Sequence, residues 1–275
     1  QKVLKYTFDI DSQRAESAIA KVLRTSNPTY TSATTSRHNC WSLYKDAIHD
    51  AWSRLIRKRV TSRLWKQTCQ IAEEGAIEVF CDNLHKALLS PPLATPKPLL
   101  VLDPGFKAGI KCAVLDARGE VESKTLRTVH FIGGTSSSRD DGKSILAELL
   151  KCTQRLTNDE CDGGIDDSDG GGNKDVCVVV GNGHGTREAR ELVSNVAKDK
   201  NIPIDIHIVN EAGASVWSVT EMASKEFPDE HAAAIAAVSI GRRYQNPLNE
   251  LVKIPPKSLG LGMYQHDLSK KELND

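Results

Sequence analysis

The stretch LLVLDPGFKAGIKCAVLD, residues 99–116, is where the fold of this chain first becomes recognisable. An apolar run reaches Asp103, Pro-Gly and a second glycine follow, and a second apolar run begins near residue 109. Short apolar runs separated by turn residues are typical of neighbouring strands. The pattern predicts that a first strand ends at Asp103, where the carboxylate could bind a metal ion, stabilise a turn or be the remnant of a catalytic site.

The segments that follow continue this pattern. Residues 109–121 and 123–132 predict two further strands, and three consecutive strands with tight turns favour an antiparallel meander. Helical and strand patterns then alternate, with helices expected at 140–156, 186–199, 212–227 and 230–245 and strands at 176–182 and 204–211. The order βββαβαβα predicts an α/β fold, a mixed sheet of the RNase H-like type with helices on its faces.

The chain before residue 98 is expected to be mainly helical. A short helix is predicted at 12–24, a polar loop at 26–39 and a helical region at 41–89. The proline-rich segment 90–98 ends this region, because proline lacks a backbone N–H and fixes its own φ.

These boundaries predict three parts of the chain. They are a helical region (1–97), the RNase H-like domain (98–247) and a connector (248–275). Residues 158–175 are rich in glycine and aspartate but lack the spacing of a calcium-binding loop. We expect this segment to be a disordered insertion in the RNase H-like domain.

Composition and charge limit the classes of function. No stretch approaches the roughly 18 apolar residues of a membrane helix, so no membrane contact is expected. The seven cysteines are scattered and form no C-x-x-C pair, which favours a reducing compartment, the nucleus or the cytoplasm. Residues 1–97 carry 15 Lys and Arg against 9 Asp and Glu, whereas the remainder carries 21 against 27. A basic and an acidic half suggest one face suited to polyanions.

Asp103 and Glu211 are the candidate site residues of the predicted sheet. Asp103 ends the first strand, and Glu211 ends the strand predicted at 204–211. Ligands of open α/β sheets bind beyond the carboxyl ends of strands. If the two strands are central neighbours, the carboxylates approach each other and could hold Mg²⁺ or Mn²⁺. The alternative is that each carboxylate stabilises the turn or helix that follows it.

The loop GNGHGTRE, residues 181–188, joins a predicted strand to a helix. Its glycines would let backbone N–H groups converge on an anion at the helix N-terminus, with His184 within reach of a phosphate. The spacing is neither that of G-x-x-x-x-G-K-[ST] nor that of G-x-G-x-x-G, so the signal for a phosphate site is weak. A structural turn with Thr186 as the N-cap is an equal alternative.

A basic stretch, RLIRKRVTSRLWK (54–66), holds six basic residues and no acidic one. It could contact a nucleic acid backbone. It could also be a solvated helix face or pair with the acidic half of the chain. The residues expected at a nucleic acid interface are Arg54, Arg57, Lys58, Arg63 and Lys66.

Five stretches in combination resemble the Tex family of transcription accessory proteins and the related eukaryotic S1 RNA-binding domain-containing proteins. They are AEEGAIEVFCDNLHKALLSPPL (72–93), VLDPGFKAGIKCAVLD (101–116), VVGNGHGTRE (179–188), VNEAGASVWS (209–218) and AVSIGRRYQNPLNELVKIPPKSLGLGMYQHD (237–267). The resemblance implies an RNase H-like domain of the YqgF type, which helix-hairpin-helix modules and an S1 domain follow in the family. It also implies that this is the central piece of a longer protein. Nucleic acid, above all RNA, would then bind mainly outside this chain, with transcription or RNA-processing proteins as partners.

YqgF domains are in turn similar to the Holliday junction resolvase RuvC. That resemblance implies a site with an aspartate on the first strand, a glutamate after the fourth and an acid in the last helix. Asp103 and Glu211 match the first two, but the third would fall near Ile235, which is no acid. Asn246 also stands where the Tex pattern usually has an acid.

Three hypotheses of function remain. The first is a catalytically inactive scaffold module, without a cofactor, in a nucleic acid-binding protein. The second is a nuclease that acts on structured nucleic acid with Mg²⁺ or Mn²⁺ held by Asp103 and Glu211. The third is an ATP-binding protein of the actin-like superfamily, against which the lack of a second matching half counts.

Overall fold

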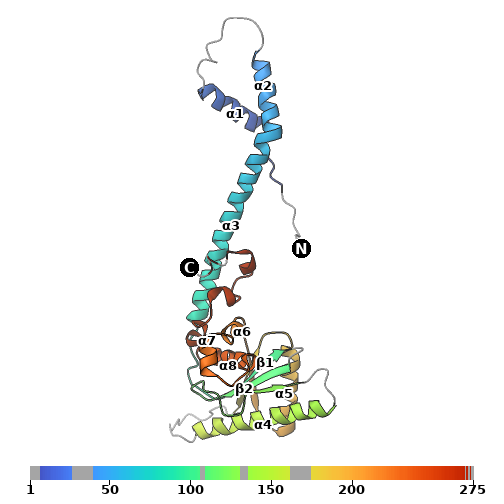
Figure 1. The fold of residues 1–275 in the computed structure, drawn as a ribbon, viewed down its shortest axis with the longest axis vertical. Helices are drawn as coiled ribbons and strands as arrows, with labels where there is room; N and C mark the ends of the chain where they lie inside the picture. Colours follow the sequence, from blue (N-terminus) through green and yellow to red (C-terminus); the bar gives the residue numbers. More distant parts are fainter. Residues whose placement is uncertain are drawn as a thin grey trace. The chain divides into compact units, whose positions relative to one another are not determined.

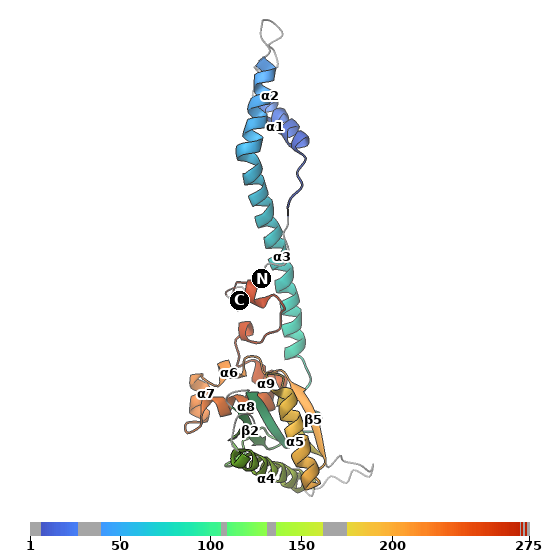
Figure 2. The same ribbon diagram turned by 90° about the vertical axis from the view of Figure 1, so that its right-hand side faces the viewer.

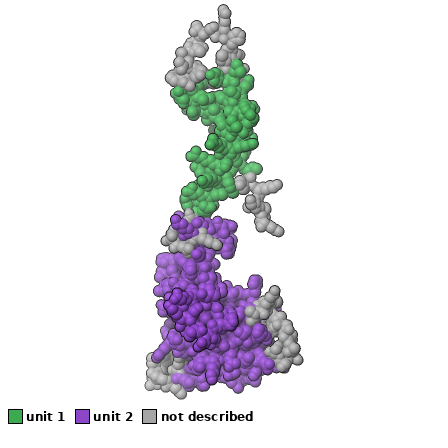
Figure 3. Space-filling model, viewed as in Figure 1, with its two compact units in different colours: residues 1–75 green, residues 76–275 purple. Residues whose placement is uncertain are grey.

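The computed structural model describes residues 7–26, 40–105, 109–130, 136–161, 175–269, 271 and 273. The chain divides into two compact units, residues 1–75 and 76–275 (Figure 3). This division falls inside a helix, whereas the predicted domain boundaries lie after residues 97 and 247, and those boundaries stay predictions. Among the described residues, no helix is both long and apolar enough to cross a membrane.

The first unit is helical, as the sequence predicts. Helix α1 covers Ser12–Ser26, and α2 (Cys40–Ala51) continues through a π-helical turn (Trp52–Ile56) into α3 (Arg57–Leu88), which extends into the second unit. Trp52 is buried, and its indole N–H donates to the Ser12 hydroxyl at 3.1 Å, which ties α1 to the helix after the loop. The loop predicted at 26–39 lies outside the described residues beyond Ser26.

The second unit is built on a five-stranded mixed sheet. The strands are β1 (Leu99–Gly105), β2 (Gly109–Leu115), β3 (Arg127–Val129), β4 (Val176–Gly181) and β5 (Ile204–Val209), in the order β3-β2-β1-β4-β5. The first three strands form the predicted antiparallel meander, while β4 and β5 run parallel to β1. The predicted fold class, an RNase H-like mixed sheet, is confirmed.

Helices cover both faces of this sheet, as Figures 1 and 2 show. Helices α4 (Ser136–Cys161) and α5 (Thr186–Lys200) pack on one face, and α8 (Ala232–Gln245) packs on the other. Strand β4 is therefore buried at every position, which explains its unbroken apolar sequence. Gly241 lets α8 approach the sheet closely, because a Cβ there would lie 2.5 Å from side-chain atoms of Leu115 and Val101.

Three predicted elements differ from the structure. The third strand is only Arg127–Val129, and the helix predicted at 140–156 extends to Cys161. The first four residues of the predicted insertion 158–175 are thus helical, and residues 162–174 lie outside the described part of the chain. The helix predicted at 212–227 is two short helices, α6 (Ala214–Trp217) and α7 (Glu221–Glu226). Thr220 divides them because its hydroxyl accepts the N–H of Ala223 and so begins α7.

The segment after α8 is ordered and packs within the second unit. It contains α9 (Pro247–Leu251) and two 3₁₀ turns, Pro256–Ser258 and Gln265–Asp267. The Asn83 side-chain amide on α3 donates to the Leu261 carbonyl at 2.8 Å. Leu261 also packs beside Phe80 and Leu84, so this segment covers the end of α3. Its continuation toward further domains stays a prediction.

Candidate functional site

Asp103 lies near the end of β1, directly opposite Lys111 of β2. Burial raises the pKa of this carboxyl to about 6, the charge of Lys111 lowers it, and the charge of Glu211 raises it. Asp103 and Glu211 therefore lie close enough for their charges to interact. Strand β4 lies between β1 and β5, so the two strands are not the neighbours that the prediction assumed. Their roles as catalytic residues or metal ligands stay predictions.

Glu211 lies two residues beyond the end of β5, on a loop that neighbouring segments fix. Its backbone N–H donates to the side-chain oxygen of Asn182 at 3.1 Å. Its carboxylate rests on the glycine loop, because a Cβ at Gly181 would lie 2.7 Å from Oε2 and one at Gly183 would overlap the whole carboxylate. The Oε2 atom is buried without a hydrogen-bond partner among the described residues.

The glycine loop, residues 181–185, packs directly against this carboxylate. Gly185 is the N-cap of α5 with φ of 101°, a left-handed conformation that favours glycine. The expected N-cap, Thr186, is instead the first helical residue, and its hydroxyl donates to the carbonyls of Gly181 and Gly183 at 2.6 and 2.7 Å. His184 is exposed in this loop, and its contact with a phosphate stays a prediction.

Arg243 of α8 binds the backbone of the Glu211 loop. The sequence analysis did not identify this residue. Its Nη1 donates to the carbonyls of Asn210 and Ala212, at 2.5 and 3.0 Å, on both sides of Glu211. Its Nε and Nη2 are buried without a hydrogen-bond partner among the described residues. Burial lowers the pKa of Arg243, whereas the charges of Glu250 and Glu211 raise it.

Glu250 of α9 is the second buried charge that sequence reasoning missed. The residue is 1% exposed, and its Oε2 accepts a hydrogen bond from the Lys253 ammonium at 2.8 Å. Its Oε1 is buried without a partner among the described residues. A surface glutamate of a short helix looks the same in sequence, so only the packing of α9 on α8 identifies it.

No third acid is found beside Asp103 and Glu211 in the described part of the chain. In the part of the chain that the structure describes, no three His, Cys, Asp or Glu side chains gather where they could hold a metal ion. Ile235, near the place of the expected third acid, is buried in an apolar cluster with Trp217 and Leu251. Asn246 has a structural role, since its side-chain oxygen accepts the N–H of Asn249 and begins α9.

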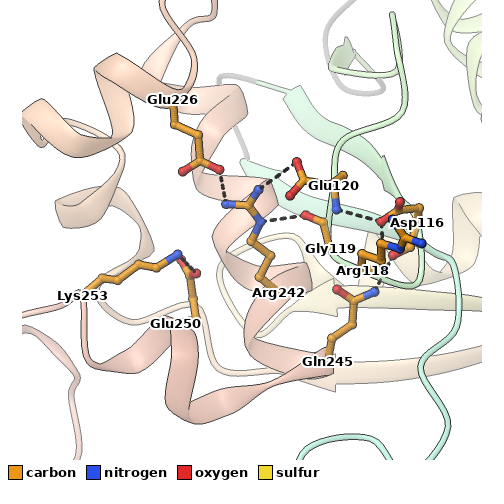
Figure 4. A network of polar contacts seen from close by, with 9 residues as sticks. All are labelled: Asp116, Arg118, Gly119, Glu120, Glu226, Arg242, Gln245, Glu250 and Lys253. Atoms are coloured by element: carbon orange, nitrogen blue, oxygen red, sulfur yellow. Dashed lines mark hydrogen bonds and ion pairs between the residues drawn. The ribbon is translucent and has the colours of Figure 1, made fainter.

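A separate polar network lies on the other side of α8 (Figure 4). Arg242 donates through Nε to the Gly119 carbonyl at 2.7 Å and pairs through Nη1 with Glu226 at 2.5 Å. The Gln245 amide donates to the carbonyl of Asp116, whose carboxylate closes the turn after β2. A pocket of about 550 Å³ adjoins this network, and neither candidate carboxylate lines it.

The predicted basic interface lies on the helix of the first unit. Arg54 is paired with Asp50 through two hydrogen bonds of 2.5 Å, which leaves it less suited to bind a ligand. The remaining predicted residues are exposed; they are Arg57, Lys58, Arg63 and Lys66. Their contact with nucleic acid stays a prediction.

The strand order, the two helical layers and the carboxylates at the strand ends define an RNase H-like α/β domain. Comparison with known proteins refines this class, because residues 173–245 match the family model of the Tex protein YqgF-like domain. The chain thus contains the YqgF-like region of a Tex-family protein, and the predicted resemblance is confirmed.

Similarity to individual relatives extends over most of the chain. It is 38% identical to the protein YdcI of Bacillus subtilis over 85% of its length, and 37% identical to Protein tex of Bordetella pertussis over 81%. It is also 32% identical to human S1 RNA-binding domain-containing protein 1 over 86%. The matched region is 29%, 25% and 21% of these relatives, so the chain spans about a quarter of their length.

Proposed function

We propose that this chain is the central scaffold module of a Tex-like nucleic acid-binding protein, linked to transcription or RNA metabolism, and that its RNase H-like site is catalytically inactive. Relatives that match it include a protein named transcriptional accessory protein Tex and one named for an S1 RNA-binding domain. The observation that carries the inactivity is the composition of the site: two carboxylates, each with a basic side chain beside it.

The physical reason lies in what two-metal cleavage requires. Two ions about 4 Å apart need several shared oxygen ligands to hold them against mutual repulsion. Asp103 and Glu211 offer only a pair, and the positive charges of Lys111 and Arg243 already interact with Asp103 and Glu211 respectively. The proposed module therefore acts without a cofactor.

Nucleic acid would meet this chain at the exposed basic residues Arg57, Lys58, Arg63 and Lys66. Contacts of this kind reach phosphates and carry no sequence preference. We propose that RNA is the main ligand, that most of its affinity comes from domains outside this chain, and that transcription or RNA-processing proteins are its partners. The free cysteines support a nuclear or cytoplasmic setting; they are Cys69, Cys81, Cys112, Cys152 and Cys177.

The alternative function is a metal-dependent nuclease of the RuvC type. The observation that favours it is that Asp103 and Glu211 lie near each other at the strand ends, where ligands of this fold bind. In that case Mg²⁺ or Mn²⁺ would be held by the two carboxylates.

A cleavage assay tests the two functions against each other. The wild-type chain and Asp103→Asn are incubated with junction DNA, single-stranded DNA and RNA in Mg²⁺ or Mn²⁺. The scaffold proposal expects no cleavage, or trace cleavage that Asp103→Asn leaves unchanged. Cleavage that is abolished in Asp103→Asn would establish the nuclease instead.

A binding assay tests the basic interface separately. Replacing Arg57, Lys58 and Arg63 together by glutamine should weaken RNA binding uniformly across sequences and reduce the salt dependence of the affinity by about one counterion per lost contact. The matched control replaces Arg187 and Arg190 on α5 of the other unit, where no effect is expected. If both variants lost the same RNA affinity, the proposal that these basic residues form the RNA interface would be refuted.

A further inference from the structure

We propose that Arg243 is a built-in counter-cation for Glu211 and positions it through the flanking backbone, so that its charge supplies what a divalent ion would otherwise supply near the carboxylate. The inference rests on the proposed inactive site, because it explains how the carboxylates are kept together without a metal. It concerns Arg243, Glu211 and Glu250, all within the second unit.

The first argument is the position of the guanidinium. Arg243 is 7% exposed and donates to the carbonyls of Asn210 and Ala212, which flank Glu211 in the chain. The guanidinium therefore fixes the backbone on both sides of the carboxylate. A lysine could not do this equally well, because a single ammonium lacks the planar fork of donors.

The second argument is the match between unpartnered atoms. Arg243 has two buried donors without partners, Nε and Nη2, whereas Glu211 Oε2 and Glu250 Oε1 are buried acceptors without partners. Unpaired buried polar atoms are costly, and a buried water typically makes about three hydrogen bonds to such groups. Unpartnered donors and acceptors are thus equal in number here, two of each, and they lie on α8, α9 and the Glu211 loop.

The third argument is the balance of charge. Three acids lie in this region, Asp103, Glu211 and Glu250, and three bases interact with them, namely Lys111, Arg243 and Lys253. A divalent cation added to this set would raise the local charge to about +2 in a region of low dielectric. An excess of positive charge in a buried region is unfavourable, so we expect the site to disfavour a metal ion.

Thermal unfolding of the whole 275-residue chain tests the pairing through a double-mutant cycle. The cycle uses wild type, Glu211→Gln, Arg243→Met and the double variant. If Arg243 compensates the Glu211 charge, the loss of Tm from Arg243→Met should fall by about half or more in the Glu211→Gln background. Losses that simply add would overturn the pairing and leave Arg243 as a clamp on the two carbonyls.

The neighbouring arginine gives the matched control. Arg242 is also on α8 and forms ion pairs, but its partners are Glu226 and Glu120 on the other side of the helix. The losses of Tm from Arg242→Met and Glu211→Gln should therefore add. Coupling of Glu211 to both arginines alike would show a general effect of charge and would overturn the proposal.

Mn²⁺ provides a second readout that a merely structural role would not change. The Tm of wild type should not respond to the ion, whereas that of Arg243→Met should rise by about 3–6 °C at ten times the Kd. The rise should be absent in the double variant. The proposal would be overturned if Mn²⁺ raised the Tm of wild type and Glu211→Gln abolished this rise.

If Arg243→Met does not fold, Arg243→Lys replaces it in the Mn²⁺ experiment. This variant keeps the charge and should show no response to Mn²⁺, so a rise in its Tm would also count against the counter-cation. These outcomes are separate from the cleavage assay. An additive cycle without any cleavage refutes only the role of Arg243, whereas cleavage that depends on Asp103 refutes the proposed function.

Discussion

Two consecutive arginines of α8 enter two different kinds of environment. Arg242 is half-buried in the network of Figure 4, where its guanidinium bonds to the Gly119 carbonyl and pairs with Glu226. Arg243 is buried, bonds to the loop around Glu211, and leaves two donors without a partner among the described residues. The two residues are one position apart, so they leave α8 about 100° apart around its axis and reach different partners.

The different partners of the two arginines suggest that Arg242 stabilises the fold, whereas Arg243 belongs to the candidate site. Arg242 joins the turn after β2 to α7 and α8 through its bond to the Gly119 carbonyl and its pair with Glu226, contacts of the kind that hold a fold together. Buried charges with unpartnered atoms are costly to keep, and such groups are found where function requires them. The four predictions that follow test this contrast in order of decreasing effect.

Glu250→Ala should cause the largest loss of stability. Removing this buried acid leaves Arg243 without one of the two negative charges that interact with it. We expect the free energy of unfolding to fall by about 3–5 kcal/mol in urea denaturation. Glu221→Ala, which breaks the exposed pair with Lys225, is the control and should change it by less than about 0.5 kcal/mol. If Glu250→Ala lowered the free energy of unfolding as little as Glu221→Ala, the contrast between the environments of Arg243 and Arg242 would be refuted.

Asp103→Asn should increase stability near neutral pH. The folded-state pKa of Asp103 is about 6, above its ordinary value of 3.8, so the folded protein binds the proton more tightly than the unfolded chain. Wild type therefore loses stability as pH rises from about 4 to 6, and the amide avoids this loss. The gain at about pH 7 should be up to about 3 kcal/mol and should vanish near pH 4. A gain that does not depend on pH would contradict the raised pKa of the buried carboxyl.

Arg242→Met should cost less than Glu250→Ala. The substitution removes the bond to the Gly119 carbonyl and the pair with Glu226, but Glu226 remains accessible to water. We expect a loss of about 1–2 kcal/mol in the free energy of unfolding. A loss as large as that of Glu250→Ala would show that the contacts of Arg242 with Gly119 and Glu226 matter as much as the buried charge of Glu250.

Gly183→Ala should have the smallest effect on stability and a local effect on the site. The new methyl group would overlap the Glu211 carboxylate, which can rotate away because it ends a flexible side chain. We expect a loss below about 1 kcal/mol, together with a displaced Glu211 carboxylate in a crystal structure. An unmoved carboxylate would show that the loop shifts instead of Glu211.

Much of the fold followed from local pattern. The strand at Asp103 and the alternation after it were sufficient for the mixed sheet, because buried strands leave unbroken apolar runs. The proximity of Asp103 and Glu211 followed from the rule that parallel strands end at one edge of a sheet. The break at Thr220 was missed, since a threonine within an amphipathic stretch is ordinary until its hydroxyl is seen to cap a helix.

The charged partners of the site could not be predicted. Arg243 and Arg242 are adjacent identical residues, and only the packing of α8 decides which of them is buried. Glu250 likewise depends on how α9 folds back onto α8. Long-range packing of this kind has no signature in spacing or composition, so the pair of carboxylates was found while its counter-charges were not.

The burial of Ile235 disfavours an acidic side chain at this position of the fold. The side chain is 2% exposed and packs with Trp217 and Leu251, at about the place where resolvases have their third acid. An aspartate there would face an apolar interior, so one substitution could not reinstate the acid without a cost of several kcal/mol. Selection would first have to rebuild the surrounding core. If the site is inactive as we propose, this packing is a barrier to gaining a third acid in a single evolutionary step.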